Sequence, residues 1–149
     1  MKVDLNKRHQ TLIGLWFALL MNIGVLFLFA FFLVPKINNE TGSGRSSLLI
    51  FTLTALGTFL VIISFSVKGK ILERAVEKQD INLLQKGLII ACALCEVSAV
   101  MGLLERFLTG NRESYLLFLI AIAGTAFHFP RREHLEAASY KTSSSGPTF

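Results

Sequence analysis

The sequence contains few of the features that a soluble enzyme or a turn-rich β protein needs. Of its 149 residues only 17% are charged, three are proline and two are cysteine. No stretch alternates apolar and polar residues in the manner of a strand in a lipid-facing barrel. A Ser, His and Asp set, a phosphate-binding glycine loop and a cluster of metal ligands are all missing. We therefore expect no enzyme activity, no cofactor and no bound metal.

Apolar residues make up 52% of the chain and include thirteen phenylalanines. They fall into four runs, and about 20 apolar residues in a helix are enough to cross a bilayer. The sequence predicts an all-α fold, a transmembrane four-helix bundle built of antiparallel hairpins, as a single domain over residues 1–135. The expected spans are residues 11–34, 48–67, 86–108 and 114–129. The Ser-rich segment 136–149 is expected to be a disordered cytoplasmic tail.

The distribution of basic residues predicts the orientation, because short loops rich in Lys and Arg stay on the cytoplasmic side. With four spans, both termini and the loop from Lys68 to Lys86 share one side of the membrane. Eleven of the fifteen basic residues lie on that side: Lys2, Lys7, Arg8, Lys68, Lys70, Arg74, Lys78, Lys86, Arg131, Arg132 and Lys141. We expect a multi-pass protein of the cell membrane, of the bacterial inner-membrane type, with both termini cytoplasmic. The partner for the basic segments is then an anionic lipid surface and not nucleic acid.

Glu96 is the most unexpected residue, because it lies near the centre of the third apolar run. A charged side chain at that depth costs at least about 2.5 kcal/mol. Lipid favours the neutral, protonated carboxyl unless water or a cation reaches it. Such a group can take up and release a proton, and Glu96 is the candidate proton-binding residue of the chain.

A strip of small residues runs along the same predicted helix at spacings of three and four. Small residues allow a second membrane helix to approach closely. The strip consists of Gly87, Ala91, Cys95, Ser98 and Gly102. Cys92 and Cys95 are interpreted as small buried interface residues, since a CxxC without further ligands is a weak metal or disulfide signal.

The stretch from Ala91 to Leu104, with Glu96 followed by small residues and Gly102-Leu-Leu, resembles the carboxylate helix of the proteolipid c subunits of rotary F-type and V-type ATP synthases. The segment from Ala75 to Asp80 looks like a loosened version of the polar loop that joins the two helices of that family. The resemblance covers roughly Ser47 to Leu108, and it is divergent in the first helix, where only Gly57 stands for the family's glycine repeat. It implies that Glu96 carries a proton. It further implies that Ser98 lies near the family's second polar position and that other membrane subunits, or further copies of this chain, are partners.

A second hypothesis comes from the residues themselves. Glu96 can instead be a neutral hydrogen-bonding residue that joins helices in a structural or accessory membrane protein, with Ser64 and Thr58 among its possible hydroxyl partners. The two hypotheses differ in the environment of Glu96, an open surface in the first and a sealed interior in the second. Further expectations concern five single residues. His128 and Trp16 are expected to be interfacial anchors, Glu105 and Arg106 to be solvated helix ends, and Asn22 to form a helix–helix hydrogen bond.

Overall fold

The computed structural model describes residues 5–32, 43–110 and 114–139, and this part of the chain is helical throughout except for short turns. The helices are α1 (Leu5–Phe32), α2 (Ser43–Lys78), α3 (Ile81–Thr109), α4 (Tyr115–Phe127) and α5 (Arg132–Ser139). The expected all-α class is confirmed. Among the described residues, three helices are long and apolar enough to cross a membrane, namely α1, α2 and α3.

The helix boundaries differ from the predicted spans in three places. α2 continues well beyond the apolar run that ends at Val67, so the charged segment after Lys68 is mostly helix and its loop shrinks to a turn. α4 has 13 residues, which at 1.5 Å per residue is about 20 Å and shorter than a hydrocarbon core of about 30 Å. Residues 136–139, expected to be disordered, form the second half of α5, and the rest of the expected tail lies outside the described residues.

Local capping explains where α2 ends and α3 begins and ends. Gln79 has a positive φ of 53°, which stops α2, and the Asp80 side chain accepts hydrogen bonds from the amides of Asn82 and Leu83. These bonds satisfy two of the free N–H groups of the first turn of α3. At the other end Gly110 adopts φ 66°, and its amide donates to the carbonyl of Arg106. Such a left-handed glycine is a common helix terminator.

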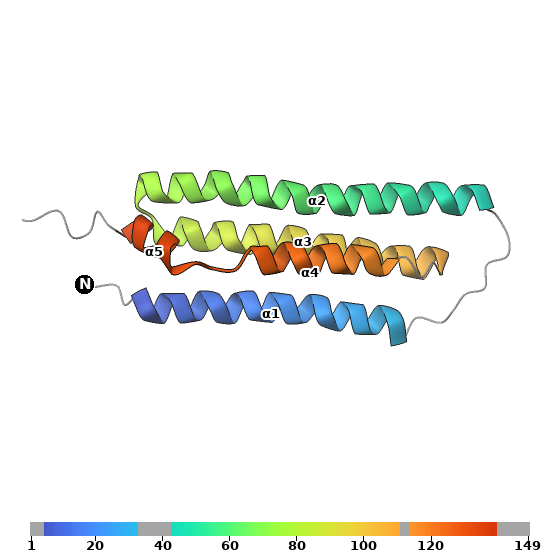
Figure 1. Cartoon of the computed structure of the whole chain (residues 1–149), viewed down its shortest axis with the longest axis horizontal. Helices are drawn as coiled ribbons and strands as arrows, with labels where there is room; N and C mark the ends of the chain where they lie inside the picture. Colours follow the sequence, from blue (N-terminus) through green and yellow to red (C-terminus); the bar gives the residue numbers. More distant parts are fainter. Residues whose placement is uncertain (1–4, 33–42, 111–113, 140–149) are drawn as a thin grey trace, which may run out of the picture.

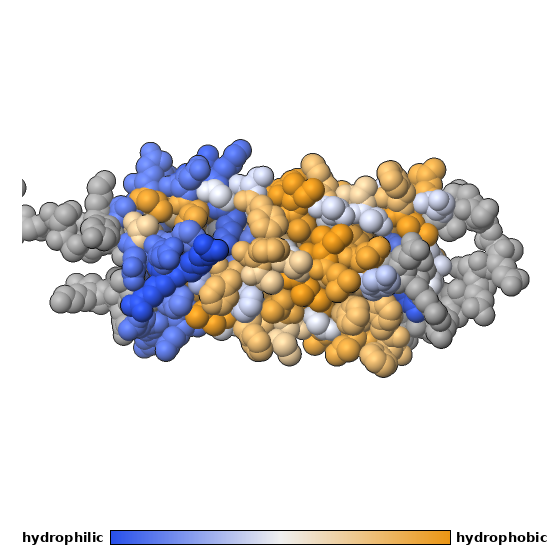
Figure 2. All heavy atoms as spheres, viewed as in Figure 1, coloured by the Kyte–Doolittle hydropathy of each residue, from blue (hydrophilic) through white to orange (hydrophobic). Residues whose placement is uncertain are grey.

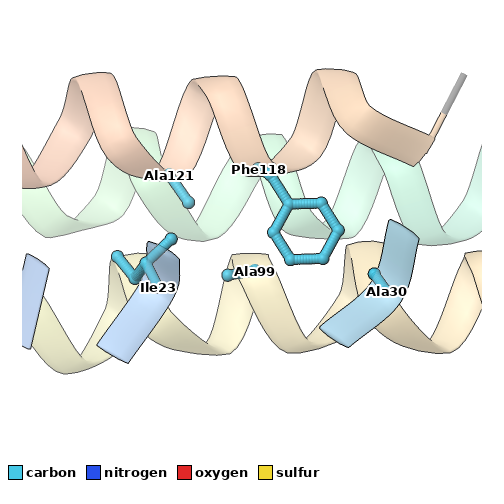
Figure 3. Packing of buried hydrophobic residues seen from close by; sticks show 5 residues of the cluster. All are labelled: Ile23, Ala30, Ala99, Phe118 and Ala121. Atoms are coloured by element: carbon cyan, nitrogen blue, oxygen red, sulfur yellow. The ribbon is translucent and has the colours of Figure 1, made fainter. Parts of the chain in front are cut away.

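The four longer helices lie side by side along the long axis of the molecule, and α3 packs against α1, α2 and α4 (Figure 1). One buried cluster joins α1, α3 and α4 through Ile23, Ala30, Ala99, Phe118 and Ala121 (Figure 3). The ring of Phe118 meets that of Phe27 edge to face, at 5.6 Å between centroids. α3 is thus the central helix of the fold.

Small residues set how closely α3 and α4 approach α2. A Cβ atom added at Gly87 would lie 2.6 Å from the Cγ2 atom of Ile71, and one added at Gly124 would lie 2.8 Å from the Cγ1 atom of Val61. Neither position has room for a side chain without a shift of the helices. Close packing of this kind supplies association energy in a membrane, where apolar burial does not.

Most of the apolar surface of α1 and α2 faces outward. Among the described residues of α1, only Leu12, Ile23 and Ala30 are buried apolar side chains. Large side chains such as Phe17 and Phe59 are more than half exposed. In Figure 2 apolar side chains cover the middle of the visible face, and hydrophilic ones gather at the end where α1 begins, α2 ends and α5 lies. An apolar belt of this size is expected of a helical protein that contacts lipid.

Candidate functional site

Glu96 lies close to the middle of α3, fifteen residues after Ile81 and thirteen before Thr109. Cys92 and Ala99, one turn before and one turn after it, belong to two different contact clusters that join α3 to α1. Helical spacing therefore places Glu96 on the side of α3 that faces α1, between the two clusters. The carboxyl sits at a seam between two helices, at half the length of α3.

The side chain of Glu96 is half-buried, and its two carboxyl oxygens differ in environment. Oε1 is inaccessible and has no hydrogen-bond partner in the described part of the chain. The side chain as a whole keeps part of its surface exposed. A sealed interior, as the packing hypothesis requires, is not what surrounds this residue.

The polar residues that were expected to support Glu96 lie elsewhere. Ser98 is fully buried, but its Oγ atom lies 3.1 Å from where a Cβ atom of Gly57 would stand, on the side of α3 that faces α2. Within the described residues the Oγ of Ser98 has no hydrogen-bond partner. Thr58 is half-buried, and in the same described part no hydrogen bond joins its hydroxyl to Oε1 of Glu96. The hydroxyl of Ser64 forms its hydrogen bonds with residues other than Glu96.

The small-residue strip is buried along its whole length, since Gly87, Ala91, Cys95, Ser98 and Gly102 are all inaccessible in α3. Gly102 faces α4, where an added Cβ would lie 3.0 Å from the Cβ of Leu117. Cys92 and Cys95 are buried free thiols. The strip packs α3 against α2 and α4, while Glu96 lies on a different side of the helix.

A second polar site, which the sequence interpretation missed, joins α2, α3 and the end of α4. The Nε2 atom of His128 lies 2.8 Å from the Oγ atom of Ser64, and the Sγ atom of Cys95 lies 3.6 Å from the same oxygen. His128 was expected at the headgroup surface, and that interpretation is wrong because the side chain is completely inaccessible. The flanking Phe127 and Phe129 suggested an anchor, and only the contact with Ser64, 64 positions earlier, reveals the burial.

The direction of the hydrogen bonds in this second site follows from the chemistry of Ser64. Its hydroxyl lies 2.6 Å from the carbonyl oxygen of Val61, and a carbonyl can only accept, so Ser64 donates its proton there. The Nε2–H group of His128 then donates to the Ser64 oxygen. Nδ1 of His128 is left as an acceptor, and it has no partner in the described residues.

Trp16 of α1 contacts the end of α4 beside this site. Its Nε1–H group donates to the carbonyl of Thr125 at 2.7 Å, and its ring meets that of Phe129 edge to face. His9, about two turns before Trp16 on α1, has its Nε2 atom 3.2 Å from the carbonyl oxygen of Pro130. Trp16 was expected to be an anchor at the interface, whereas in the structure its indole donates to a backbone carbonyl of another helix, which also accepts from the amide of His128.

Three other sequence-based expectations are corrected. Glu105 and Arg106 were expected to be solvated, but they are 1% and 3% exposed. Thr54 donates to Oε2 of Glu105, and Nη1 of Arg106 donates to the carbonyl of Gly110 while the guanidinium lies 5.5 Å from the ring centroid of Phe31. Groups on α2 and at the end of α3 therefore bind these two side chains in place of water. Asn22 was expected to join two helices, yet its side chain is exposed on α1.

The fold and these sites define a class, an all-helical protein with three helices able to cross a membrane and a half-buried carboxyl at mid-helix. No family model, curated protein or solved structure matches this chain.

Proposed function

We propose that the protein is a four-helix transmembrane bundle of antiparallel hairpins in which Glu96 binds a proton at the seam between α1 and α3. The observation that carries this proposal is the state of Glu96, half-buried at mid-helix with one buried oxygen that has no hydrogen-bond partner in the described part of the chain. A residue retained only as packing glue needs a partner on the neighbouring helix, because an unsatisfied polar group in lipid costs several kcal/mol. A carboxyl that binds and releases a proton instead needs an exposed surface through which protons can reach it.

The fourth span is α4 together with the residues that follow it. Pro130 has no N–H group and disfavours helical geometry at Phe129, so α4 ends before the chain has crossed the full core. The non-helical residues 128–131 that follow Phe127 add further length, at most about 3.3–3.6 Å per residue. Non-helical backbone at membrane depth is tolerated only where protein covers it. The contact of His9 with the carbonyl of Pro130 lies in this segment, and the bond of Trp16 to the carbonyl of Thr125 covers the last turn of α4 just before it.

The proposed orientation has both termini and the turn at Gln79 in the cytoplasm. The hydrophilic end in Figure 2, where α1 begins, α2 ends and α5 lies, is consistent with the basic side that the sequence assigns to the cytoplasm. In the rotary proteolipids that the carboxylate helix resembles, a proton passes between the carboxyl and another membrane subunit. The exposed apolar faces of α1 and α2 offer surface for such a neighbour, either another copy of this chain or a different membrane subunit.

The test is the protonation state of Glu96 in reconstituted protein. Infrared difference spectra should show a band of a protonated carboxyl that titrates with pH and that disappears in Glu96→Gln. Glu105→Gln is the matched control, since Glu105 is a second buried carboxyl at the end of the same helix. The band assigned to Glu96 should survive in that control.

A hydrophobic carbodiimide supplies an independent readout. We expect it to modify Glu96 from the lipid phase at a rate that depends on pH, and we expect Glu96→Gln to abolish the labelling. A carboxyl that neither titrates nor reacts in the folded protein would contradict proton exchange.

The second candidate is a structural or accessory membrane protein, and a specific observation favours it. The polar groups of Ser64, His128 and Trp16 all join helices to one another. If Glu96→Gln leaves every spectroscopic and labelling property unchanged, Glu96 belongs with these residues and the protein is a scaffold for other membrane proteins.

A further inference from the structure

A small cavity opens at the basic end of the molecule, where four helices and the connection from α4 to α5 meet. Its volume is about 30 Å³. Apolar side chains from α1, α2 and α3 form most of its wall, with Leu12, Leu72 and Leu88 among them. Three basic residues complete the lining, Lys68 from α2, Arg131 from the connection and His134 from α5.

The three basic groups lie close enough to affect one another, and neither of the two cations is paired with a carboxylate of the described part of the chain. Burial lowers the pKa of the His134 imidazole, and the charges of Lys68 and Arg131 lower it further against an opposing effect of Glu133. Within the described residues, neither Lys68 nor Arg131 takes part in an ion pair, whereas the adjacent Arg132 is paired with Glu136 at 3.0 Å. Two cations without an ion-pair partner in the described part of the chain thus lie beside an apolar wall.

The position of Lys68 along α2 places this cluster at the expected membrane surface. It directly follows Val67, where the apolar run of α2 ends, and α2 beyond it carries charged residues as far as Lys78. Arg131 follows Pro130, at the end of the segment that completes the fourth proposed span. Both cations therefore sit where the headgroups of the cytoplasmic leaflet would lie.

The size and chemistry of the cavity select among possible anions. A cavity of about 30 Å³ has room for about two or three water molecules, which is too little to enclose a soluble anion with its hydration shell. A free phosphate would also have to exchange its hydration shell for a wall made mostly of apolar residues. A phospholipid needs no enclosure, since the bilayer holds its acyl chains and only its phosphate has to meet the cations.

We infer that Lys68, Arg131 and His134 form a binding site for the phosphate group of an anionic phospholipid in the cytoplasmic leaflet. The inference rests on the proposed insertion in the membrane and is independent of any proton on Glu96.

The experiment measures lipid retention by the full chain in detergent, with phosphatidylglycerol and phosphatidylcholine as probes and native mass spectrometry as the readout. We expect the chain to retain phosphatidylglycerol in preference to phosphatidylcholine. The double variant Lys68→Gln with Arg131→Gln should lose about fivefold in affinity for each cation removed, about 25-fold together. The matched control is Lys70→Gln with Lys86→Gln, which removes the same charge from exposed positions on α2 and α3 outside the cavity. Its affinity should change far less.

A charge-conserving variant and a competition with phosphate separate the lipid site from misfolding, a diffuse surface effect and a soluble anion. Lys68→Arg with Arg131→Lys keeps both charges, so it should retain the lipid, and it checks that loss of binding does not reflect misfolding. Equal losses in the two charge-removing doubles would overturn the site in favour of a diffuse surface effect. Inorganic phosphate that displaces the lipid at comparable concentration would overturn it in favour of a soluble anion.

A last pair of measurements keeps this inference distinct from the proposed function. Glu96→Gln should bind phosphatidylglycerol as the native chain does, whatever its effect on proton binding. A chain found outside the membrane fraction would refute insertion itself, whereas an inserted chain without preference for phosphatidylglycerol would refute only the lipid site.

Discussion

Trp16, the one tryptophan of the chain, connects two helices through a single strong contact. The substitution Trp16→Phe keeps an aromatic ring but removes the donor to the carbonyl of Thr125. We expect a loss of about 0.5–1.5 kcal/mol in the free energy of unfolding, because one hydrogen bond between helices is lost while the carbonyl keeps its bond from the amide of His128. Reversible unfolding in mixed micelles measures this. Phe17→Leu, at a neighbouring position that is 55% exposed, is the control and should change stability little.

The hydrogen bond between Ser64 and His128 joins α2 to the end of α4 across 64 positions of sequence. Ser64→Ala removes the acceptor for the Nε2–H group of His128 and leaves both ring nitrogens unpaired. Membrane hydrogen bonds between side chains average about 0.6 kcal/mol in double-mutant cycles, with a maximum near 1.7 kcal/mol. A cycle of Ser64→Ala and His128→Ala should give a coupling energy within that range. A coupling of zero would mean that the two groups do not interact in the folded protein.

His134 of α5 provides a pH-dependent contribution to stability. Burial, followed by the charges of Lys68 and Arg131, lowers the pKa of its imidazole below the ordinary 6.5. The unfolded chain therefore binds more protons than the folded one once the pH falls below 6.5, and stability decreases in that direction. We expect the native chain to lose stability on acidification more steeply than His134→Gln. Parallel acid titrations of the two in detergent, followed by unfolding, measure the difference.

At the scale of helices, close approach at glycine is the feature most open to test. Gly124→Ala would place a Cβ atom 2.8 Å from Val61 and 3.0 Å from the sulfur of Cys95. We expect a loss of about 1–3 kcal/mol from overpacking. Gly24→Ala is the matched control, because nothing lies within 4 Å of an added Cβ there. It should leave stability unchanged or raise it, since alanine is the better helix former by up to about 1 kcal/mol. Equal effects in both variants would show that packing at Gly124 is loose.

The elements themselves were predictable to different degrees, for identifiable reasons. Continuous apolar runs indicated the three long helices, since length and hydropathy are local properties of the sequence. The extension of α2 to Lys78 and the presence of α5 were less visible, because their residues are polar and α5 docks through few side chains, among them Leu135. The end of α4 follows from Pro130, but the carbonyl contacts of Trp16 that make such an early end tolerable depend on tertiary structure.

The candidate site, too, could be predicted from the sequence only in part, because its surroundings depend on the whole molecule. Glu96 could be identified from sequence because a carboxylate within an apolar run is unusual in isolation. Which residues surround it depends on how the helices pack against one another, which directs Ser98 of α3 toward Gly57 of α2 and brings Ser64 of α2 to His128 at the end of α4. The burial of Glu105 likewise required the partner Thr54 on another helix.

Topology is the property of the whole molecule on which the proposed function depends. In a background with Cys92→Ala and Cys95→Ala, we expect Ser47→Cys and Leu108→Cys to react with a membrane-impermeant maleimide added to intact cells. Lys78→Cys and Arg132→Cys should react only after permeabilisation. Positions 47 and 78 are separated by 31 residues of α2, about 46 Å at 1.5 Å per residue, which exceeds the hydrocarbon thickness.

The pair at Leu108 and Arg132 tests the fourth span, because α4 alone is about 20 Å long. Labelling of both positions from the same side would mean that α4 enters the membrane and returns, or lies against α3 without crossing. Labelling from opposite sides would require the segment that ends at Pro130 to complete the crossing. In that case the carbonyls held by Trp16 and His9 lie within the membrane, and Trp16→Phe should destabilise the arrangement of α4 more than that of α2.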